Sequence, residues 1–229
     1  MALAFSVAPS NATSSISTQL TTNWGVYGAV CPELPNNIVA YVESIEVKGH
    51  LQARQASRSL ALMRLSWGWY LNLPFGTAST TIEGYLADGT FGYRDTTGYD
   101  NDYSYTSHAH GWGTGPTDAL TTYVVGIQLV SPGGQEWSLV PQLGDLESVE
   151  GGITTGLGKF SAGWTATSGG ISGWWVVPDG TTGTVVVESA SEVTIDGVAV
   201  TTTPLEGRNG LVSVIGSGGS HNISVVFSS

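Results

Sequence analysis

A single carboxylate in aromatic surroundings is the part of this sequence best suited to do chemistry. Glu83 lies in the segment Ser79–Tyr93, which also supplies two tyrosines and a phenylalanine. A carboxylate can remove or supply a proton while aromatic rings stack on a pyranose, and glycoside hydrolysis uses a pair of carboxyl groups. The same residue also suits a structural role, in which it caps a turn or pairs with Arg94. The functional interpretation predicts a sugar site that still needs a partner carboxyl group.

Two histidines close to a tryptophan form the second candidate group. His108 and His110 are two positions apart and precede Trp112. No Glu-x-x-His spacing or cysteine cluster accompanies them, so we expect neither a metal site nor a cofactor. We expect His110 to hydrogen-bond a sugar hydroxyl beside Trp112, and the alternative is a buried histidine at the start of a helix. Trp69 and Tyr85 complete the set of predicted substrate-binding residues.

Four aspartates surround Glu83 in the sequence without forming a calcium-binding loop. Carboxylate oxygens are ligands that Ca²⁺ prefers, but the Asp-x-Asp-x-Asp-Gly spacing is absent. We therefore expect these residues to form turns in a solvated loop. They are Asp88, Asp95, Asp100 and Asp102.

Composition limits the class of partner. The chain has 229 residues and a formal net charge of -11, with seven lysines and arginines in total. Nucleic acids and anionic membranes both require a basic surface, so we expect neither as a partner. No apolar run approaches the roughly 18 residues of a membrane-spanning helix. Few charges and eight tryptophans favour an uncharged carbohydrate as the partner.

The first half of the chain has the periodicity of helices. We expect helices over residues 10–24, 33–51, 53–70 and 117–126, and a long irregular loop over 71–107. In the second helix, Ile38, Val42 and Ile45 should form a buried stripe. Loops of this length inside compact domains tend to be functional, so the elements around 71–107 must position the candidate site.

After Gly126 the hydrophobic period changes to two. Phe160, Ala162 and Trp164 alternate with polar residues, and Asp196-Gly197 between two apolar runs predicts a tight hairpin turn. Short strands separated by glycine-rich turns favour a sandwich of antiparallel sheets. The fold class is therefore α+β with two domains, which we place at residues 1–126 and 127–229.

The order of the motifs resembles the C-terminal portion of α-L-rhamnosidase-like six-hairpin glycosidases. No single motif is as specific as their succession. The segments that carry the resemblance are Trp67–Tyr70, Ser79–Arg94, Thr106–Trp112, Thr122–Ile127, Pro132-Gly133, Pro141–Asp145, Glu150–Thr155 and Gly158–Phe160.

This resemblance implies helices from part of an (α/α)6 barrel, followed by an antiparallel β-sandwich. It also implies inverting hydrolysis of terminal α-L-rhamnosyl bonds, with Glu83 as the general base and His110 lining the sugar site. The sequence has Ile-Glu-Gly-Tyr at residues 82–85, where many members have Trp-Glu-Arg-Trp. Glu33, Glu43 and Glu46 do not lie in the family's general-acid context, so we expect the acid segment to be missing and this chain alone to be inactive.

Further expectations follow from an incomplete barrel. Leu60, Met63 and Trp67 should be uncovered, and such faces promote self-association. We expect the parent protein to be extracellular, although the start Met1–Val7 lacks the basic segment of a signal peptide.

Two other functions stay open. The second half could be a non-catalytic carbohydrate-binding or stabilising module that uses Trp174-Trp175, or the enzyme could act on another sugar.

Overall fold

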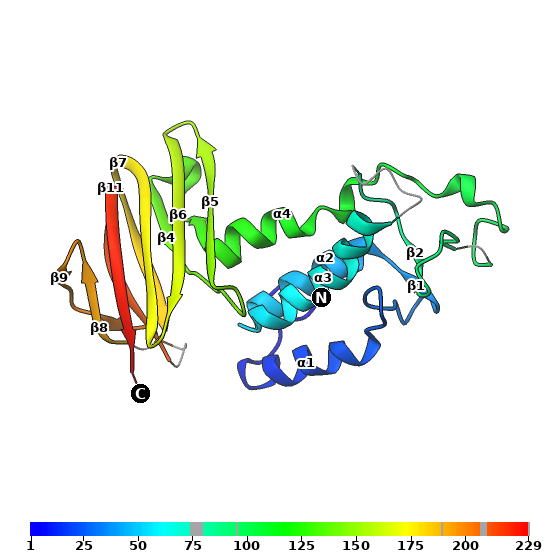
Figure 1. Ribbon diagram of the computed structural model, residues 1–229, viewed down its shortest axis with the longest axis horizontal. Helices are drawn as coiled ribbons and strands as arrows, with labels where there is room; N and C mark the ends of the chain where they lie inside the picture. Colours follow the sequence, from blue (N-terminus) through cyan, green and yellow to red (C-terminus); the bar gives the residue numbers. More distant parts are fainter. Residues whose placement is uncertain (74–79, 95, 189, 207–209, 229) are drawn as a thin grey trace. The chain divides into compact units, whose positions relative to one another are not determined.

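The computed structural model describes residues 1–73, 80–94, 96–188, 190–206 and 210–228. The chain divides into two compact units, Met1–Ala119 and Leu120–Ser229. Helices dominate the first unit and antiparallel strands the second, so the predicted α+β class is confirmed (Figure 1). The assignment of the units to a barrel domain and a sandwich domain stays a prediction. Ser79 and Asp95 from the sequence motifs lie outside the described residues.

Unit 1 contains the helices α1 (Thr13–Leu20), α2 (Ala40–Gln52), α3 (Ala56–Asn72) and α4 (Gly115–Ala119). The prediction of a helix over residues 33–39 is wrong. Asn36 has a φ of 64°, which no α-helix accommodates, and Pro35 precedes it. The predicted stripe fails with it, because Ile38 belongs to a strand and Val42 is exposed.

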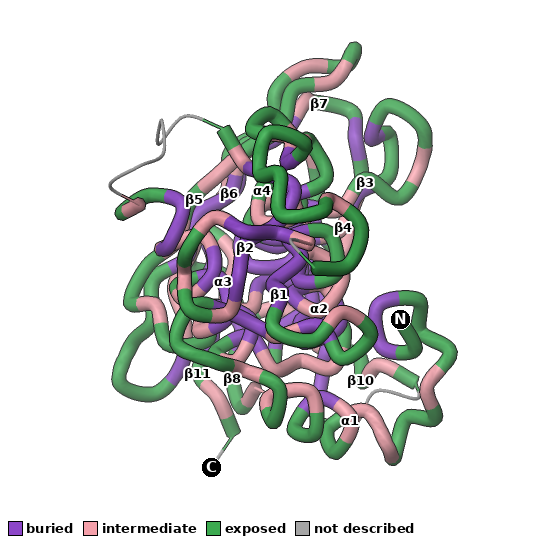
Figure 2. The backbone as a smooth tube through the Cα atoms, turned by 90° about the vertical axis from the view of Figure 1, so that its right-hand side faces the viewer, coloured by how far each residue is buried: buried purple, intermediate pink, exposed green. Residues whose placement is uncertain are grey.

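A short two-stranded sheet connects the start of α2 to the predicted loop. Strand β1 (Asn37–Ile38) pairs antiparallel with β2 (Tyr85–Leu86), and all four residues are buried (Figure 2). This pairing fixes one end of the loop against the helical core. The remainder of the loop contains a 3₁₀ turn, Tyr103–Tyr105, and a second turn follows at Gly111–Gly113.

Buried polar contacts fasten α1 to the two longer helices. Ser17 Oγ lies 2.7 Å from His50 Nδ1 on α2, and Arg58 on α3 donates to Ser17 Oγ at 2.6 Å. Leu60 and Met63 are buried, so the expectation that they are uncovered is wrong. Self-association of the chain stays a prediction. Among the described residues, no helix is long and apolar enough to span a membrane.

Unit 2 begins with a π-helical segment, Leu120–Val125, and continues as nine strands within its described residues. Seven of the eight strand pairs described in this sheet are antiparallel, and β4 and β7 run parallel. The strands are β3 (Ile127–Leu129), β4 (Glu136–Leu139), β5 (Ser148–Thr155), β6 (Gly158–Thr167), β7 (Gly170–Glu188), β8 (Ala190–Ile195), β9 (Val198–Ala199), β10 (Thr203–Pro204) and β11 (Leu211–Phe227).

Two long strands form the spine of unit 2 (Figure 1). Strands β7 and β11 pair antiparallel along most of their lengths, with a register shift between Ser217 and Gly219. On its other side β7 pairs first with β6 and then with β4. The rings of Trp137 on β4 and Trp175 on the first half of β7 lie 6.2 Å apart. The sheet therefore folds over and encloses its core between its own halves.

The alternation found in the sequence explains the core of unit 2. Phe160, Ala162 and Trp164 on β6 are all buried, as their period-two pattern predicts. Asp196 and Gly197 have φ angles of 50° and 79° and join β8 to β9 by the two-residue turn that the sequence predicts.

Close contact between a glycine and a tryptophan gives a testable consequence for this core. A Cβ on Gly183 would lie 2.2 Å from the Trp137 ring, which is 2% exposed. We expect Gly183→Ala to destabilise unit 2 by about 1–3 kcal/mol, because the ring must move in a packed core.

Urea denaturation followed by tryptophan fluorescence measures this effect. The matched control is Gly156→Ala in the β5–β6 turn, where a Cβ meets no atom within 4 Å. Equal denaturation midpoints for the two variants would contradict the packing described here.

Candidate functional site

Two segments that run side by side in opposite directions bring the predicted site residues together. Glu83 N donates to Ser107 O at 2.9 Å, and His110 N donates to Thr81 O at 2.8 Å. The Thr81 hydroxyl donates in return to His110 O at 2.7 Å. Trp112 Nε1 then donates to the main-chain oxygen of Glu83 at 3.2 Å. Glu83, His110 and Trp112 are therefore neighbours.

The Glu83 side chain is 8% exposed and held at both carboxylate oxygens. Tyr99 Oη donates to Oε1 at 2.8 Å, and Ser107 N donates to Oε2 at 3.3 Å. These donors come from residues 16 and 24 positions further along the chain. The carboxylate is thus fixed by the path of the loop, rather than capping a turn of its own.

Arg94 acts on Glu83 through an aromatic ring. Its guanidinium carbon lies 5.3 Å from the centre of the Tyr99 ring, and Nη2 donates to Thr97 O at 3.3 Å. Burial raises the pKa of Tyr99, and its hydrogen bond to the Glu83 carboxylate raises it further. The phenol therefore remains a proton donor to Glu83, and a cation over its ring favours that donation.

The glycine after Glu83 accommodates a second tyrosine. A Cβ on Gly84 would lie 2.5 Å from the Tyr93 ring and 2.7 Å from Ile38 O. Burial, followed by the charge of Glu83, raises the pKa of Tyr93 to about 12. A longer side chain at position 84 would displace this ring. Position 84 is glycine here and arginine in the Trp-Glu-Arg-Trp pattern, and the Tyr93 ring fills the space that a side chain at this position would need.

A cluster of tilted aromatic rings adjoins the Glu83 main chain and reaches the surface. The rings of His110 and Trp112 are 4.0 Å apart, and those of Tyr41 and Trp112 are 5.4 Å apart. Trp112 is 37% exposed and Tyr41 is 44% exposed, so ring surface is available to a ligand. Tyr41 and Tyr99 are site residues that the sequence motifs do not predict. Tyr41 has no motif around it, and Tyr99 is marked only by its place in an acidic loop.

The other two predicted binding residues lie in the core. Trp69 and Tyr85 stack on each other at 3.7 Å with an interplanar angle of 5°, and both are buried. Trp69 Nε1 donates to Gly89 O at 3.0 Å, and Tyr85 Oη donates to Tyr27 O at 2.7 Å. The polar atoms of both side chains are thus hydrogen-bonded within the protein. Tyr85, two residues after Glu83, anchors that segment in the core.

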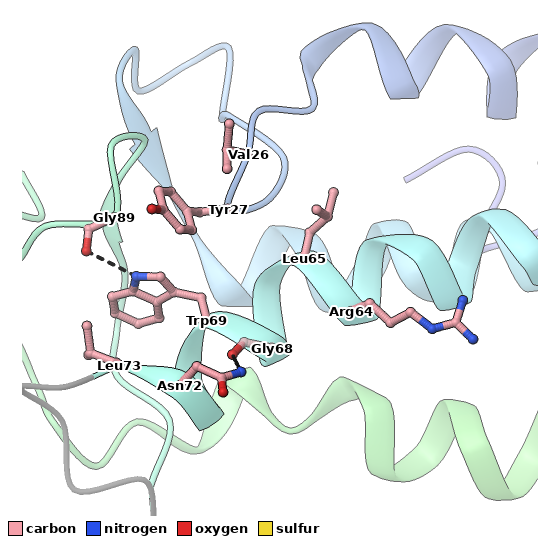
Figure 3. Close-up of a pocket in the computed structure, with 9 residues that line it drawn as sticks. All are labelled: Val26, Tyr27, Arg64, Leu65, Gly68, Trp69, Asn72, Leu73 and Gly89. Carbon is pink, nitrogen blue, oxygen red and sulfur yellow. Dashed lines mark hydrogen bonds between the residues drawn. The ribbon is translucent and has the colours of Figure 1, made fainter.

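A separate pocket of about 470 Å³ lies along α3, and Trp69 lines one end of it (Figure 3). Tyr27 lies over the same end, whereas the Arg64 side chain extends away toward the other (Figure 3). Glu83 is not among the lining residues. The candidate site and this pocket are therefore different places in unit 1.

The acidic residues of the loop include two that stabilise turns. Asp88 accepts hydrogen bonds from the amide and the hydroxyl of Thr90, and Asp102 accepts from Ser104 N. These bonds lower the pKa of both carboxyls. Within the described residues, no group of three or more histidine, cysteine, aspartate or glutamate side chains is arranged to hold a metal ion.

A second buried carboxyl group belongs to Glu43 on α2. Its Oε1 accepts hydrogen bonds from Ser66 Oγ and from Ala29 N, the latter at 2.8 Å, whereas Oε2 is buried without a partner. Burial raises the pKa of Glu43 to about 8, with a smaller contribution from the charge of Glu46. Perturbed carboxyl groups often mark catalytic sites. At 1% exposure, however, Glu43 is out of reach of any substrate in this conformation.

The tryptophan pair of unit 2 does not form a flat platform. Trp175 is fully buried in the core, whereas Trp174 is half-buried, because consecutive residues of a strand point to opposite faces. A Cβ on Gly163 would lie 2.6 Å from Trp174 Nε1, so this ring lies over the β6 backbone. The two rings therefore cannot stack together on one sugar, which counts against a lectin-like role for this pair.

Comparison with known proteins finds a family similar to part of the second unit. Residues 126–201 match the family model for the bacterial alpha-L-rhamnosidase C-terminal domain. The predicted resemblance to α-L-rhamnosidases is confirmed in this part of the chain. No curated protein sequence matches the chain.

Solved structures of α-L-rhamnosidases are also similar to it. The enzyme from Dictyoglumus thermophilum aligns with 53% of this chain at 23% identity and a TM-score of 0.47. The Streptomyces avermitilis enzyme complexed with L-rhamnose aligns with 92% at 16% identity and a TM-score of 0.45. The Aspergillus terreus enzyme aligns with 93% at 16% identity and a TM-score of 0.43. The aligned parts span 14%, 23% and 26% of these enzymes.

The buried Glu43 predicts a pH-dependent stability of unit 1. Its pKa of about 8 in the folded state exceeds the ordinary value of 4.5. Between these pH values the Glu43 carboxyl is therefore protonated in the folded chain and ionised in the unfolded chain. The stabilisation is complete below pH 4.5 and is lost as the pH rises through 8. For a single group, the free energy of unfolding can fall by at most about 1.4 kcal/mol per pH unit.

Glu43→Gln should remove this dependence, since the amide is neutral at every pH. Chemical denaturation followed by helical circular dichroism from pH 4.5 to 8 measures the slope. Glu136→Gln, at an exposed position of β4, is the control and should leave the slope unchanged. A slope in Glu43→Gln equal to that of the unmodified chain would show that Glu43 is not the group responsible.

Proposed function

We propose that this chain supplies the general base and the sugar-stacking rings of a glycoside hydrolase site that removes terminal α-L-rhamnosyl groups with inversion. The observation that carries the proposal is Glu83, whose carboxylate is fixed by two donors and whose main-chain oxygen accepts from the indole of the exposed Trp112. Similarity of residues 126–201 to the C-terminal domain of bacterial α-L-rhamnosidases favours a rhamnosyl group over other sugars.

The geometry around Glu83 suits a base that activates water. A carboxylate oxygen can accept two hydrogen bonds, and Tyr99 and Ser107 each occupy one position on a different oxygen. Each oxygen can therefore accept a further bond from a water molecule. Such a water would lose a proton to Glu83 as it attacks the anomeric carbon.

The adjacent rings suit the binding of the sugar itself. Trp112 and Tyr41 present apolar ring surface, on which the C–H face of a pyranose can stack. The imidazole of His110, 4.0 Å from the Trp112 ring, can exchange a hydrogen bond with a sugar hydroxyl. A deoxyhexose such as rhamnose, which carries a methyl group and three ring hydroxyls, offers partners of both kinds.

Inversion also requires a general acid about 6.5–9.5 Å from the base. Glu43 has the raised pKa of an acid, but its burial between α2 and α3 keeps it from a substrate. We therefore propose that this chain contributes the base without the acid, and that by itself it has little or no turnover.

Hydrolysis of an aryl α-L-rhamnoside tests the proposal. We expect no turnover above the uncatalysed rate for this chain. In a protein that combines it with an acid segment, Glu83→Gln should lower kcat by about 10²–10⁴-fold, the usual contribution of general base catalysis. Asp102→Asn, which alters a turn-forming carboxylate of the same loop, is the control and should retain activity.

Three results would contradict parts of the proposal. Robust turnover by this chain that is lost in Glu83→Gln would show that the acid is present after all. Turnover unaffected by Glu83→Gln would exclude Glu83 as the base. Hydrolysis of another glycoside in preference to the rhamnoside would change the sugar while keeping the class of enzyme.

A further inference from the structure

A second group of interacting polar side chains lies in unit 2, outside the candidate site. His221 on β11 places Nδ1 2.7 Å from Asp196 Oδ2, which belongs to the β8–β9 turn. Its Nε2 lies 3.1 Å from Ser217 Oγ and 3.1 Å from Gly218 O. One imidazole therefore connects the turn of the edge hairpin to the middle of the longest strand pair.

The backbone explains why these groups meet. The register of β11 against β7 shifts between Ser217 and Gly219, so the strand bulges just before His221. On the other side, Asp196 Oδ1 accepts from Asn222 N at 2.8 Å, and Asp196 N donates to Asn222 O at 2.9 Å. The turn is thus fastened to β11 by one backbone bond and by one bond that the Asp196 side chain accepts, and the imidazole adds a bond from the turn to the bulge.

The arrangement has the connectivity of a nucleophilic triad, but its hydrogen bonding favours another role. In a triad, the histidine accepts a proton from the serine and keeps Nε2 unprotonated. Here Nε2 also faces Gly218 O, which can only accept a hydrogen bond. Asp196 is likewise an acceptor for Nδ1. His221 satisfies both only when both ring nitrogens carry protons.

We propose that doubly protonated His221 is a latch that fastens the β8–β9 turn to the bulge of β11. Loss of one proton leaves two acceptors, Nε2 and Gly218 O, facing each other at 3.1 Å. The contact then becomes repulsive, and the bulge is released from the edge hairpin. The protein would thereby make the closure of this sheet edge depend on pH.

The surrounding charges act in the direction that the latch requires. The hydrogen bond with Asp196 is the largest influence and raises the pKa of His221. Burial opposes it, and the bond to Gly218 O and the charge of Asp196 raise the pKa further. The pKa of Asp196 is lowered, first by Asn222 N–H and then by His221. Asp179 lies nearby on the β7 bend, where its Oδ1 would be 3.6 Å from a Cβ on Gly219.

These shifts define when the latch is closed. The stabilisation from His221 is complete below its ordinary pKa of 6.5 and is lost as the pH rises through its raised value in the folded protein. The stabilisation from Asp196 is lost as the pH falls through its lowered pKa. The latch is therefore closed in the acidic to neutral range and opens in the alkaline direction.

A buried tryptophan lies next to the latch. The rings of Trp175 and His221 are 5.1 Å apart, and Trp175 Nε1 donates to Ser217 O at 3.1 Å. Release of the bulge should change this bond. The indole N–H resonance of Trp175 is thus a second probe, independent of the histidine signal.

An NMR pH titration of the full chain tests the proposal. We expect His221 to titrate above 6.5 and Asp196→Asn to lower its pKa toward that value. The protection of Asn222 N–H from exchange, corrected for the intrinsic rate, should fall about tenfold as the pH passes through the pKa of His221. The Trp175 indole resonance should shift with the same midpoint. Ser217→Ala is the control and should leave the titration in place, because the latch does not need the hydroxyl.

Two results would overturn the latch. A pKa of His221 at or below 6.5, unchanged in Asp196→Asn, would show that the imidazole is not held in its charged form. Covalent labelling of Ser217 by an aryl fluorophosphonate would show instead that His221 is a neutral base that activates the serine.

Discussion

The candidate site depends on the contact between residues 80–83 and 107–110. Two backbone bonds, from Glu83 N to Ser107 O and from His110 N to Thr81 O, hold these segments together although more than 20 residues separate them. Through this contact the Glu83 carboxylate reaches Ser107 N, and its carbonyl reaches the Trp112 indole. Without it, the Glu83 carboxylate and the rings of His110 and Trp112 would belong to separate parts of the chain.

Two buried carboxyl groups among the described residues of unit 1, Glu83 and Glu43, show how burial and hydrogen bonding favour different roles. Glu83 has a donor at each oxygen and lies beside exposed rings, so it can accept a further bond from water. Glu43 has one oxygen without a partner and lies deep against α3, where burial favours its neutral form. The first arrangement suits chemistry at a surface, whereas the second makes the stability of the core depend on pH.

Much of the fold could be predicted because it follows from local patterns. The alternation of Phe160, Ala162 and Trp164 identifies a half-buried strand, and Asp196-Gly197 identifies a tight turn. The helix over residues 33–39 was predicted wrongly because the apolar periodicity outweighed Pro35 in that interpretation.

The site could be predicted only in part. Glu83, His110 and Trp112 lie in motifs, but the residues that orient Glu83 do so through a loop whose path no periodicity describes. Tyr99 therefore could not be found from spacing. Trp69 and Tyr85 stack on each other in the core, and their contact with a ligand stays a prediction.

Titration of this chain with L-rhamnose, observed at the Trp112 indole N–H by NMR, tests the account most directly. The account predicts a saturable shift that Trp112→Ala abolishes and Trp174→Ala preserves. Absence of a shift at Trp112, or binding that persists in Trp112→Ala, would contradict it.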